Sequence, residues 1–451
     1  MVKRAIGIAL AFIGLVVGAG FASGQEISQY FVAFGLSGIW GAVIAGVVMA
    51  AAGLATLELG SYFQAKEHRF VLDRVTHPIL SRFFDASIMF TLFFTGVIMI
   101  AGAGANLQQQ FGLPIIVGAL IMVGMVILAG FLDVDKVTRL IGAITPLVII
   151  FLVSVAIYSI VTATESVSTL TPVAHATVHT SLPHWSISAL NYVGMEFIIA
   201  VSMAIVMGGD FVDPRSAGLG GLLGGIVFGI LLALSALGLI YAVRDTAGYD
   251  MPTLQMVELV SPKLAVVVAL IIFAMIFNTA IGMFYAFAKR ASSSKPERFR
   301  PILIVTTLVA FGVSFIGFKK LIAIFYPIIG YIGIVLIAVM VYAWLRQRSK
   351  ISDEAERRGR IRALVARKLN PGLRFGRKHA AALKRALSRS PIKDQDLSDS
   401  IHDEVAQELA SDDAVDFSEE DAAKYSTEDK DSKPEEAPAK PSEQSGGSTA
   451  Q

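Results

Sequence analysis

Cysteine is absent from all 451 residues, which excludes disulfide bonds, thiolate metal sites and thiol catalysis. Charge is also scarce, because Asp, Glu, Lys and Arg make up only 16% of the chain, where about a quarter is typical of soluble domains. Apolar residues are abundant, at 54%. So few charges cannot coat a water-soluble globule of this size, and the chain is predicted to lie in a lipid bilayer.

The apolar residues form runs of roughly 20 residues, the length that an α-helix needs to cross a hydrocarbon core. We predict an all-α membrane protein with ten transmembrane helices, near residues 5–33, 37–64, 84–110, 113–132, 138–161, 186–209, 217–243, 263–288, 301–317 and 320–345. The first run has an alternative interpretation as a signal peptide, because Lys3 and Arg4 precede it. Cleavage would leave nine spans, which do not divide into two equal halves.

The net charge of +2 hides an uneven distribution of Lys and Arg among the loops. With the N-terminus inside, the inner loops hold seventeen Lys and Arg and the outer loops hold four, at Arg244, Lys263, Lys319 and Lys320. This is a strong positive-inside bias. We therefore predict a multi-pass protein of the inner cell membrane with both termini in the cytoplasm.

The composition changes after the last apolar run, so we divide the chain into a membrane domain at 1–348, a basic segment at 349–392 and an acidic tail at 393–451. The basic segment is predicted to form one or two amphipathic helices, broken at Asn370-Pro371-Gly372 and lying on an anionic membrane surface, or else an ordinary solvated tail. Residues 394–443 carry eighteen acids and four lysines, a composition that predicts disorder.

The first span contains the string Gly18-Ala19-Gly20-Phe21-Ala22-Ser23-Gly24-Gln25-Glu26 near mid-membrane. Glycine costs about 1 kcal/mol against alanine inside a helix, and buried Gln and Glu are more costly in hydrocarbon. Close helix packing accounts for Gly18 and Gly20, but not for Gln25 and Glu26. The string therefore predicts a helix that is broken in the membrane and lines a binding site.

Two further spans carry polar groups. The sixth span opens the second half of a five-plus-five layout and holds Asn191-Tyr192-Val193-Gly194-Met195-Glu196, so an inverted repeat predicts a second broken helix there. Interhelical packing is the alternative. The eighth span holds Asn278 and Thr279, whose oxygens could coordinate a small cation, although a membrane threonine often bonds to its own helix.

The string GAGFASGQE and the ten-span layout resemble the YkvI-type family of bacterial membrane proteins. That family is grouped with the amino acid, polyamine and organocation superfamily and resembles the leucine-transporter fold. The resemblance covers about residues 1–348. It implies ten helices as an inverted repeat of five and five, with helices one and six broken.

The resemblance also implies a division of roles among the polar residues. Substrate would be held by backbone and side chains at Gly18, Ala19, Gly20, Ser23, Gly24, Gln25, Asn191, Tyr192 and Gly194. A sodium ion would lie between the carbonyls of Gly14 and Val17 and the side chains of Asn278 and Thr279. The chain has Phe21 where sodium symporters of this fold commonly have Asn, and one hydroxyl in the eighth span where they have two, so a second sodium site is not expected.

We therefore predict a secondary active transporter of a small amino-acid-like or related zwitterionic solute, working by alternating access. Sodium is the expected coupling ion. No cofactor is expected apart from this bound ion. Proton coupling through Glu26 or Glu196 is the alternative, because a buried carboxyl can carry a proton. The expected partners are the solute and the lipid bilayer, with no nucleic acid, and the oligomeric state is left open.

Two other function classes compete with transport. A membrane solute sensor would use the same pocket without net transport, but no output domain is recognisable after Lys350. An enzyme would need a nucleophile with its base, or a His and carboxylate cluster, at one depth of the membrane, and the spans show none.

Overall fold

The computed structural model describes residues 2–131 and 145–418, apart from 393, 411–414 and 416. Within these residues the chain forms helices and loops only. The helices are α1 Val2–Val16, α2 Ala19–Ser23, α3 Gln25–Tyr30, η1 Val32–Phe34, α4 Leu36–Phe63, α5 His68–Val75, α6 Pro78–Phe111, α7 Ile115–Ala129, α9 Thr145–Val161, α10 Val167–Thr177, α11 Trp185–Gly209, α12 Pro214–Tyr241, α13 Val243–Thr246, α14 Pro252–Val260, α15 Pro262–Ala291, η2 Pro296–Arg298, α16 Phe299–Ser314, α17 Phe318–Leu369, α18 Arg377–Leu387 and α19 Asp394–Ala410.

Helix ends follow local sequence signals. Pro214 and Pro262 stand in the first turns of α12 and α15, where the missing N–H costs nothing. The Asp213 side chain caps α12 by accepting from two backbone N–H groups. Gly112 ends α6 with a left-handed conformation, φ 68°. These signals explain why the helix ends lie close to the predicted spans.

Six described helices are long and apolar enough to cross a membrane, namely α4, α6, α11, α12, α15 and α17. Three shorter apolar helices, at Arg4–Val16, Ile115–Ala129 and Ile149–Val161, match the first, fourth and fifth predicted spans, and α16 matches the ninth. The start of the fifth span, residues 138–144, lies outside the described residues. The prediction of a helical membrane protein is confirmed, whereas the count of ten and the inverted repeat stay predictions.

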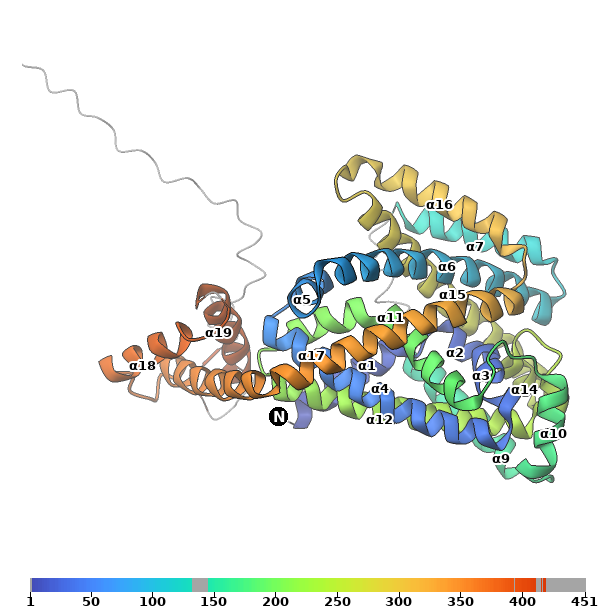
Figure 1. Cartoon of the computed structure of the whole chain (residues 1–451), viewed down its shortest axis with the longest axis horizontal. Helices are drawn as coiled ribbons and strands as arrows, with labels where there is room; N and C mark the ends of the chain where they lie inside the picture. The colour runs from blue at the N-terminus through green and yellow to red at the C-terminus, as the bar shows by residue number, and fades with distance from the viewer. Residues whose placement is uncertain (1, 132–144, 393, 411–414, 416, 419–451) are drawn as a thin grey trace, which may run out of the picture. The chain divides into compact units, whose positions relative to one another are not determined.

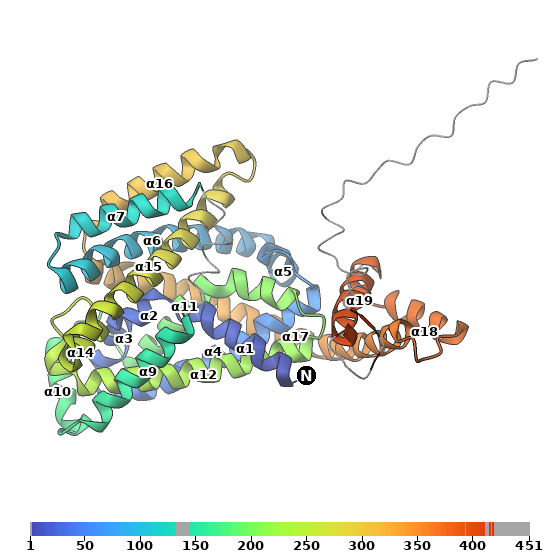
Figure 2. The same cartoon turned by 180° about the vertical axis from the view of Figure 1, so that it is seen from behind.

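The membrane helices pack in two groups, visible in Figures 1 and 2. In one group α12 lies against α4 and α1, and α4 lies against α11. In the other, α6 packs against α15, α7 and α16. Glycines let α4 and α12 approach closely, since a Cβ on Gly46 would stand 2.6 Å from the Cα of Gly229. The glycines of the seventh span therefore serve packing.

The first span is broken, as the sequence predicted. Helix α1 ends at Val16, and α2 begins at Ala19 and ends at Ser23, followed by Gly24, which has a left-handed conformation with φ 76°. Helix α3 then starts at Gln25. The interruption thus covers the glycine-rich string and leaves backbone groups without helical partners inside the bundle.

The predicted break in the sixth span is wrong. Helix α11 runs without interruption from Trp185 to Gly209. Gly194 has a packing role instead, because a Cβ there would collide with the backbone of α17 at Gly330 and Ile334. The Asn191 side chain donates to the Pro327 carbonyl of α17 at 2.9 Å. The alternative of interhelical packing therefore explains both residues.

The described residues from 356 onward form a separate compact unit. Helix α17 ends at Leu369 and α18 begins at Arg377, so a break lies at the predicted Asn370-Pro371-Gly372. Disorder from residue 394 is a wrong prediction for 394–410, which form α19. Leu397, Ile401 and Val405 are buried at a four-residue spacing, a helical stripe that the acidic average conceals. Residues 411–414, 416 and 419–451 of the predicted tail lie outside the described residues.

Candidate functional site

The break in the first span is held by local hydrogen bonds and is buried. The Ser23 hydroxyl donates to the Gly20 carbonyl at 2.7 Å, and the Gln25 backbone N–H donates to Ser23 Oγ at 3.1 Å. Ser23, Gln25 and Glu26 are all buried. The polar half of the predicted string therefore lies inside the protein and not against lipid.

Gly20 makes room for the Glu26 carboxyl. A Cβ added to Gly20 would collide with the carboxyl oxygens of Glu26, six residues further along the chain. Only glycine leaves this space free. Glycine at residue 20 is therefore required for the Glu26 carboxyl to lie where it does.

The carboxyl groups of Glu26 on α3 and Glu196 on α11 lie within hydrogen-bonding range of each other. Tyr326 of α17 faces Glu26, and Tyr192 of α11 faces Glu196. In the described part of the chain, no lysine or arginine is among the groups that act on either carboxyl. The structure therefore joins two predicted coupling residues into one buried acidic pair.

Tyr30 and Asn191 extend this polar centre. The Tyr30 hydroxyl donates to Asn191 Oδ1 at 3.2 Å, and Ser188 donates to the Tyr30 carbonyl at 2.6 Å. The ring of Tyr192 lies 5.3 Å from that of Tyr30 and 5.0 Å from that of Phe31. Hydrogen bonds and ring packing together fix α3 against α11.

Helix α14 covers the end of the break. A Cβ on Gly24 would stand against the Thr253 side chain, so α14 approaches the chain closely there. Gln109 of α6 exchanges two hydrogen bonds with the Met251 backbone, at 3.1 and 2.9 Å. Lys319 of α17 donates to the Gly248 carbonyl at 2.9 Å. Hydrogen bonds from α6 and α17 therefore hold residues 248–253 over the break.

The predicted sodium residues come from two parts of the chain. Helix α2, which follows Gly14 and Val17 in the chain, packs against α15, which carries Asn278 and Thr279. The Oδ1 atom of Asn278 is buried and has no hydrogen-bond partner, an orphaned acceptor of the kind that a cation would satisfy. Gly14 lies in the last turn of α1 and Val17 in the break, where carbonyls lack partners within the helix.

Other predicted residues are placed less centrally. Gly194 faces the α17 backbone and not the break in the first span. Tyr326 and Thr253 were missed by the sequence analysis, although both contact residues of the string. One feature of the sequence could have singled out Tyr326, since this tyrosine directly precedes a proline, Pro327, inside an apolar span.

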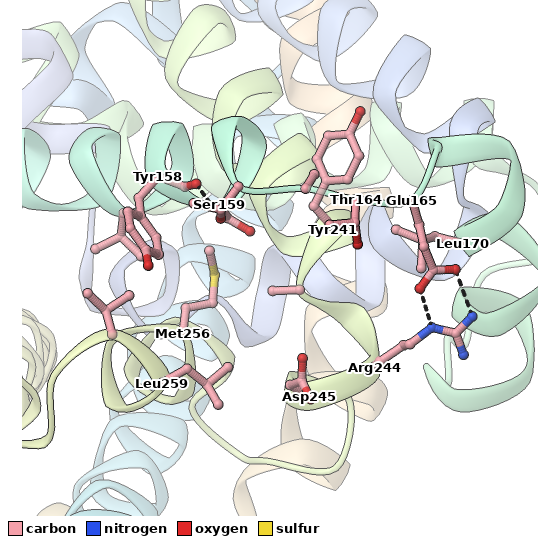
Figure 3. A pocket seen from close by; sticks show the side chains of 15 residues that line it. Tyr158, Ser159, Thr164, Glu165, Leu170, Tyr241, Arg244, Asp245, Met256 and Leu259 are labelled. Carbon is pink, nitrogen blue, oxygen red and sulfur yellow. Dashed lines mark hydrogen bonds and ion pairs between the residues drawn. The ribbon is translucent and has the colours of Figure 1, made fainter.

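A pocket of about 310 Å³ lies elsewhere, between α9, α12 and α14, and Figure 3 shows its lining. The Arg244 guanidinium and the Glu165 carboxylate pair there at 2.8 and 2.9 Å. This pairing lowers the pKa of Glu165 below its usual value. None of the residues predicted to bind substrate or ion lines this pocket.

The fold and the buried centre define a class. In its described residues the chain is a helical membrane protein with the leucine-transporter-like fold. The structure of MhsT in complex with L-phenylalanine matches it with a TM-score of 0.50 at 14% identity, over 88% of this chain and 98% of MhsT.

Sequence comparison gives two relatives in Bacillus subtilis (strain 168). The membrane protein YkvI is 27% identical over 333 residues, which are 74% of this chain and 94% of YkvI. The protein YyaD is 23% identical over 335 residues, 73% of this chain and 94% of YyaD. No family model matches the chain. The resemblance to YkvI that the first-span string indicated is thereby confirmed.

Proposed function

We propose that this protein is a secondary active transporter of a small amino-acid-like or related zwitterionic solute, coupled to an ion and working by alternating access. The carrying observation is the broken first span, whose polar residues are buried between α11, α14 and α15. Broken membrane helices of this kind expose backbone donors and acceptors to a solute at mid-membrane. The function is proposed for a multi-pass protein of the inner membrane with cytoplasmic termini.

The chemistry of the break supports the solute class. Its buried side chains are neutral or acidic, at Ser23, Gln25 and Glu26. The carboxylate of a zwitterionic solute would meet the backbone N–H groups that the break frees, and its ammonium group would meet the carbonyl groups freed there. MhsT, whose fold the chain shares, was solved in complex with L-phenylalanine. We propose Gly18, Ala19 and Gly20 as the backbone part of this site, with Gly24, Asn191 and Tyr192 beside it.

We propose one sodium ion as a transported partner of the solute, held between the break and α15. Its ligands would be the carbonyls of Gly14 and Val17 and the oxygens of Asn278 and Thr279. Oxygen-only coordination suits a hard cation, and the unpartnered Asn278 Oδ1 supports the assignment.

Transport by purified protein in proteoliposomes tests the proposal. A panel of radiolabelled amino acids is offered with an inward sodium gradient or an equal potassium gradient. At equal pH on both sides, we expect one solute class to accumulate with the sodium gradient and not with the potassium gradient. Thr279→Ala should remove the sodium dependence, whereas the matched control Thr307→Ala, whose hydroxyl donates to Leu303 within α16, should keep it. Saturable binding without accumulation would indicate a sensor and refute the transporter.

A further inference from the structure

Two buried carboxyl groups meet between the first span and the sixth. Glu26 is 2% exposed and Glu196 is 7% exposed, and they come from α3 and α11, which are 170 positions apart at these residues. Their carboxyl groups lie within hydrogen-bonding range. Since burying one such group is already costly in a membrane, two in contact require a specific compensation.

The surroundings of the pair supply hydroxyl groups and no positive charge. Tyr326 faces Glu26 and Tyr192 faces Glu196, and the charges of the pair also act on Tyr30, which Tyr331 adjoins. These tyrosines and the two acids are the titratable groups that meet there within the described residues. Neither a lysine nor an arginine balances the acids in that part of the chain.

One acceptor at the pair lacks a partner. The Oε2 atom of Glu26 is buried without a hydrogen bond. Buried polar atoms in native proteins are nearly always satisfied. An unfilled carboxyl acceptor in contact with a second carboxyl group points to a small bound species between the helices.

A single proton shared by the two carboxyl groups supplies both the charge compensation and the missing hydrogen bond. If both carboxyls were ionised, their charges would repel in a poorly polarisable interior with no cation beside them. One proton converts the contact into an O–H···O⁻ hydrogen bond, in which one carboxyl donates and the other accepts. It needs no cavity, which fits two groups already in contact.

We propose that Glu26 and Glu196 form one proton-binding site, which couples proton movement to the transport proposed above. In the closed state the pair holds one proton. When α3 moves away from α11, the shared hydrogen bond breaks and the proton passes to water, leaving two separated carboxylates. Gly20 and the left-handed Gly24, which both precede α3 in the chain, allow α3 to lie where it does. The inference rests on the proposed function for its coupling role only.

Infrared difference spectroscopy of the purified full-length protein tests the site without any solute. We expect a protonated-carboxyl C=O band near neutral pH that shifts in heavy water. The band should be lost in the Glu26→Gln/Glu196→Gln double variant and retained in Glu58→Gln. Glu58 is the matched control, a carboxyl within α4 that accepts from Trp344 Nε1. No such band in the wild type, or a band that survives the double variant, overturns the proposal. Loss of the wild-type band on adding NaCl, but not KCl, would also overturn it, in favour of a metal ion.

Transport by the single variants tests the coupling. For a solute that the wild type carries, Glu26→Gln and Glu196→Gln should each abolish accumulation driven by a pH gradient and retain solute exchange without a gradient. Retained exchange shows that the variant is folded. Accumulation that persists in both variants refutes proton coupling. If the wild type exchanges no solute, the proposed function fails, while the infrared band still decides the proton site.

Discussion

The Glu26 carboxyl occupies the space beside Gly20 that a side chain at residue 20 would fill. Gly20→Ala should therefore push the carboxyl away from Glu196. Overpacking of this kind costs about 1–3 kcal/mol, and we expect a lower melting temperature in detergent together with loss of ion-driven solute accumulation.

Gly18→Ala is the matched control for Gly20→Ala. It lies in the same break, its φ is −95°, and a Cβ there meets nothing within 4 Å. We expect its melting temperature to stay near that of the wild type. An equal loss of melting temperature in the two variants would show that the break tolerates no added side chain and would remove the special role of Gly20.

Gly24 joins two demands, a left-handed backbone with φ 76° and close contact with Thr253. A non-glycine residue in that conformation costs about 1–3 kcal/mol, so Gly24→Ala should lower the melting temperature. Gly112→Ala is the matched control, because its φ is 68° and its Cβ would meet nothing within 4 Å.

The two glycine variants separate backbone strain from contact with α14. Gly24→Ala should destabilise more than Gly112→Ala, and Thr253→Ala in the Gly24→Ala background should recover the difference. Equal destabilisation by Gly24→Ala and Gly112→Ala, measured by thermal unfolding, would mean that α14 can shift at Thr253 without a cost in stability.

The sequence predicted the break in the first span because three glycines and two costly polar groups occur together there, and packing could not explain both. It did not predict that α11 is continuous, because Asn191 and Gly194 are satisfied by Pro327 and Gly330 of α17. Such contacts between distant segments leave no local signal.

The contact between Glu26 and Glu196 could not be predicted from the sequence for the same reason. Each acid could be singled out as a costly residue within a span. Their meeting depends on how α3 packs against α11, and that depends on residues from several helices. Composition averaged over a long tail also concealed the apolar stripe of α19, which only a window of about 17 residues would show.

His68, on α5 outside the membrane spans, should make stability depend on pH. Burial and then the positive charge of Arg290 lower its pKa from 6.5 to about 4, although Asp85 lies 3.7 Å away. Between these values the unfolded chain binds the proton and the folded chain does not, so stability is lost as pH falls from about 6.5 toward 4. At about 1.4 kcal/mol per unit, the loss is at most about 3 kcal/mol.

Melting temperatures of wild type and His68→Gln across this pH range check the effect. The variant should lose less stability on acidification than the wild type, and the exposed His175→Gln should follow the wild type. Parallel curves of melting temperature against pH for wild type and His68→Gln would show that protonation of His68 does not destabilise the folded protein.

The packing of α19 in the C-terminal unit predicts how this unit responds to mutation. Ile401 is buried, whereas Gln407 on the same helix is exposed. Ile401→Asp would bury an unpaired charge, so we expect α19 to be released and cut early in limited proteolysis, while Gln407→Asp should keep the wild-type pattern.

Truncation after Ser390 removes α19 and everything beyond it. The described residues up to 355 form a compact unit of their own, so we expect the truncated chain to keep the melting temperature of its membrane part and its solute exchange. The prediction depends on the separateness of the two units. If truncation unfolds the membrane helices, as seen by gel filtration and thermal unfolding, the C-terminal unit is a structural requirement of the fold. If it changes only the rate of exchange, the unit regulates a transporter that is complete without it.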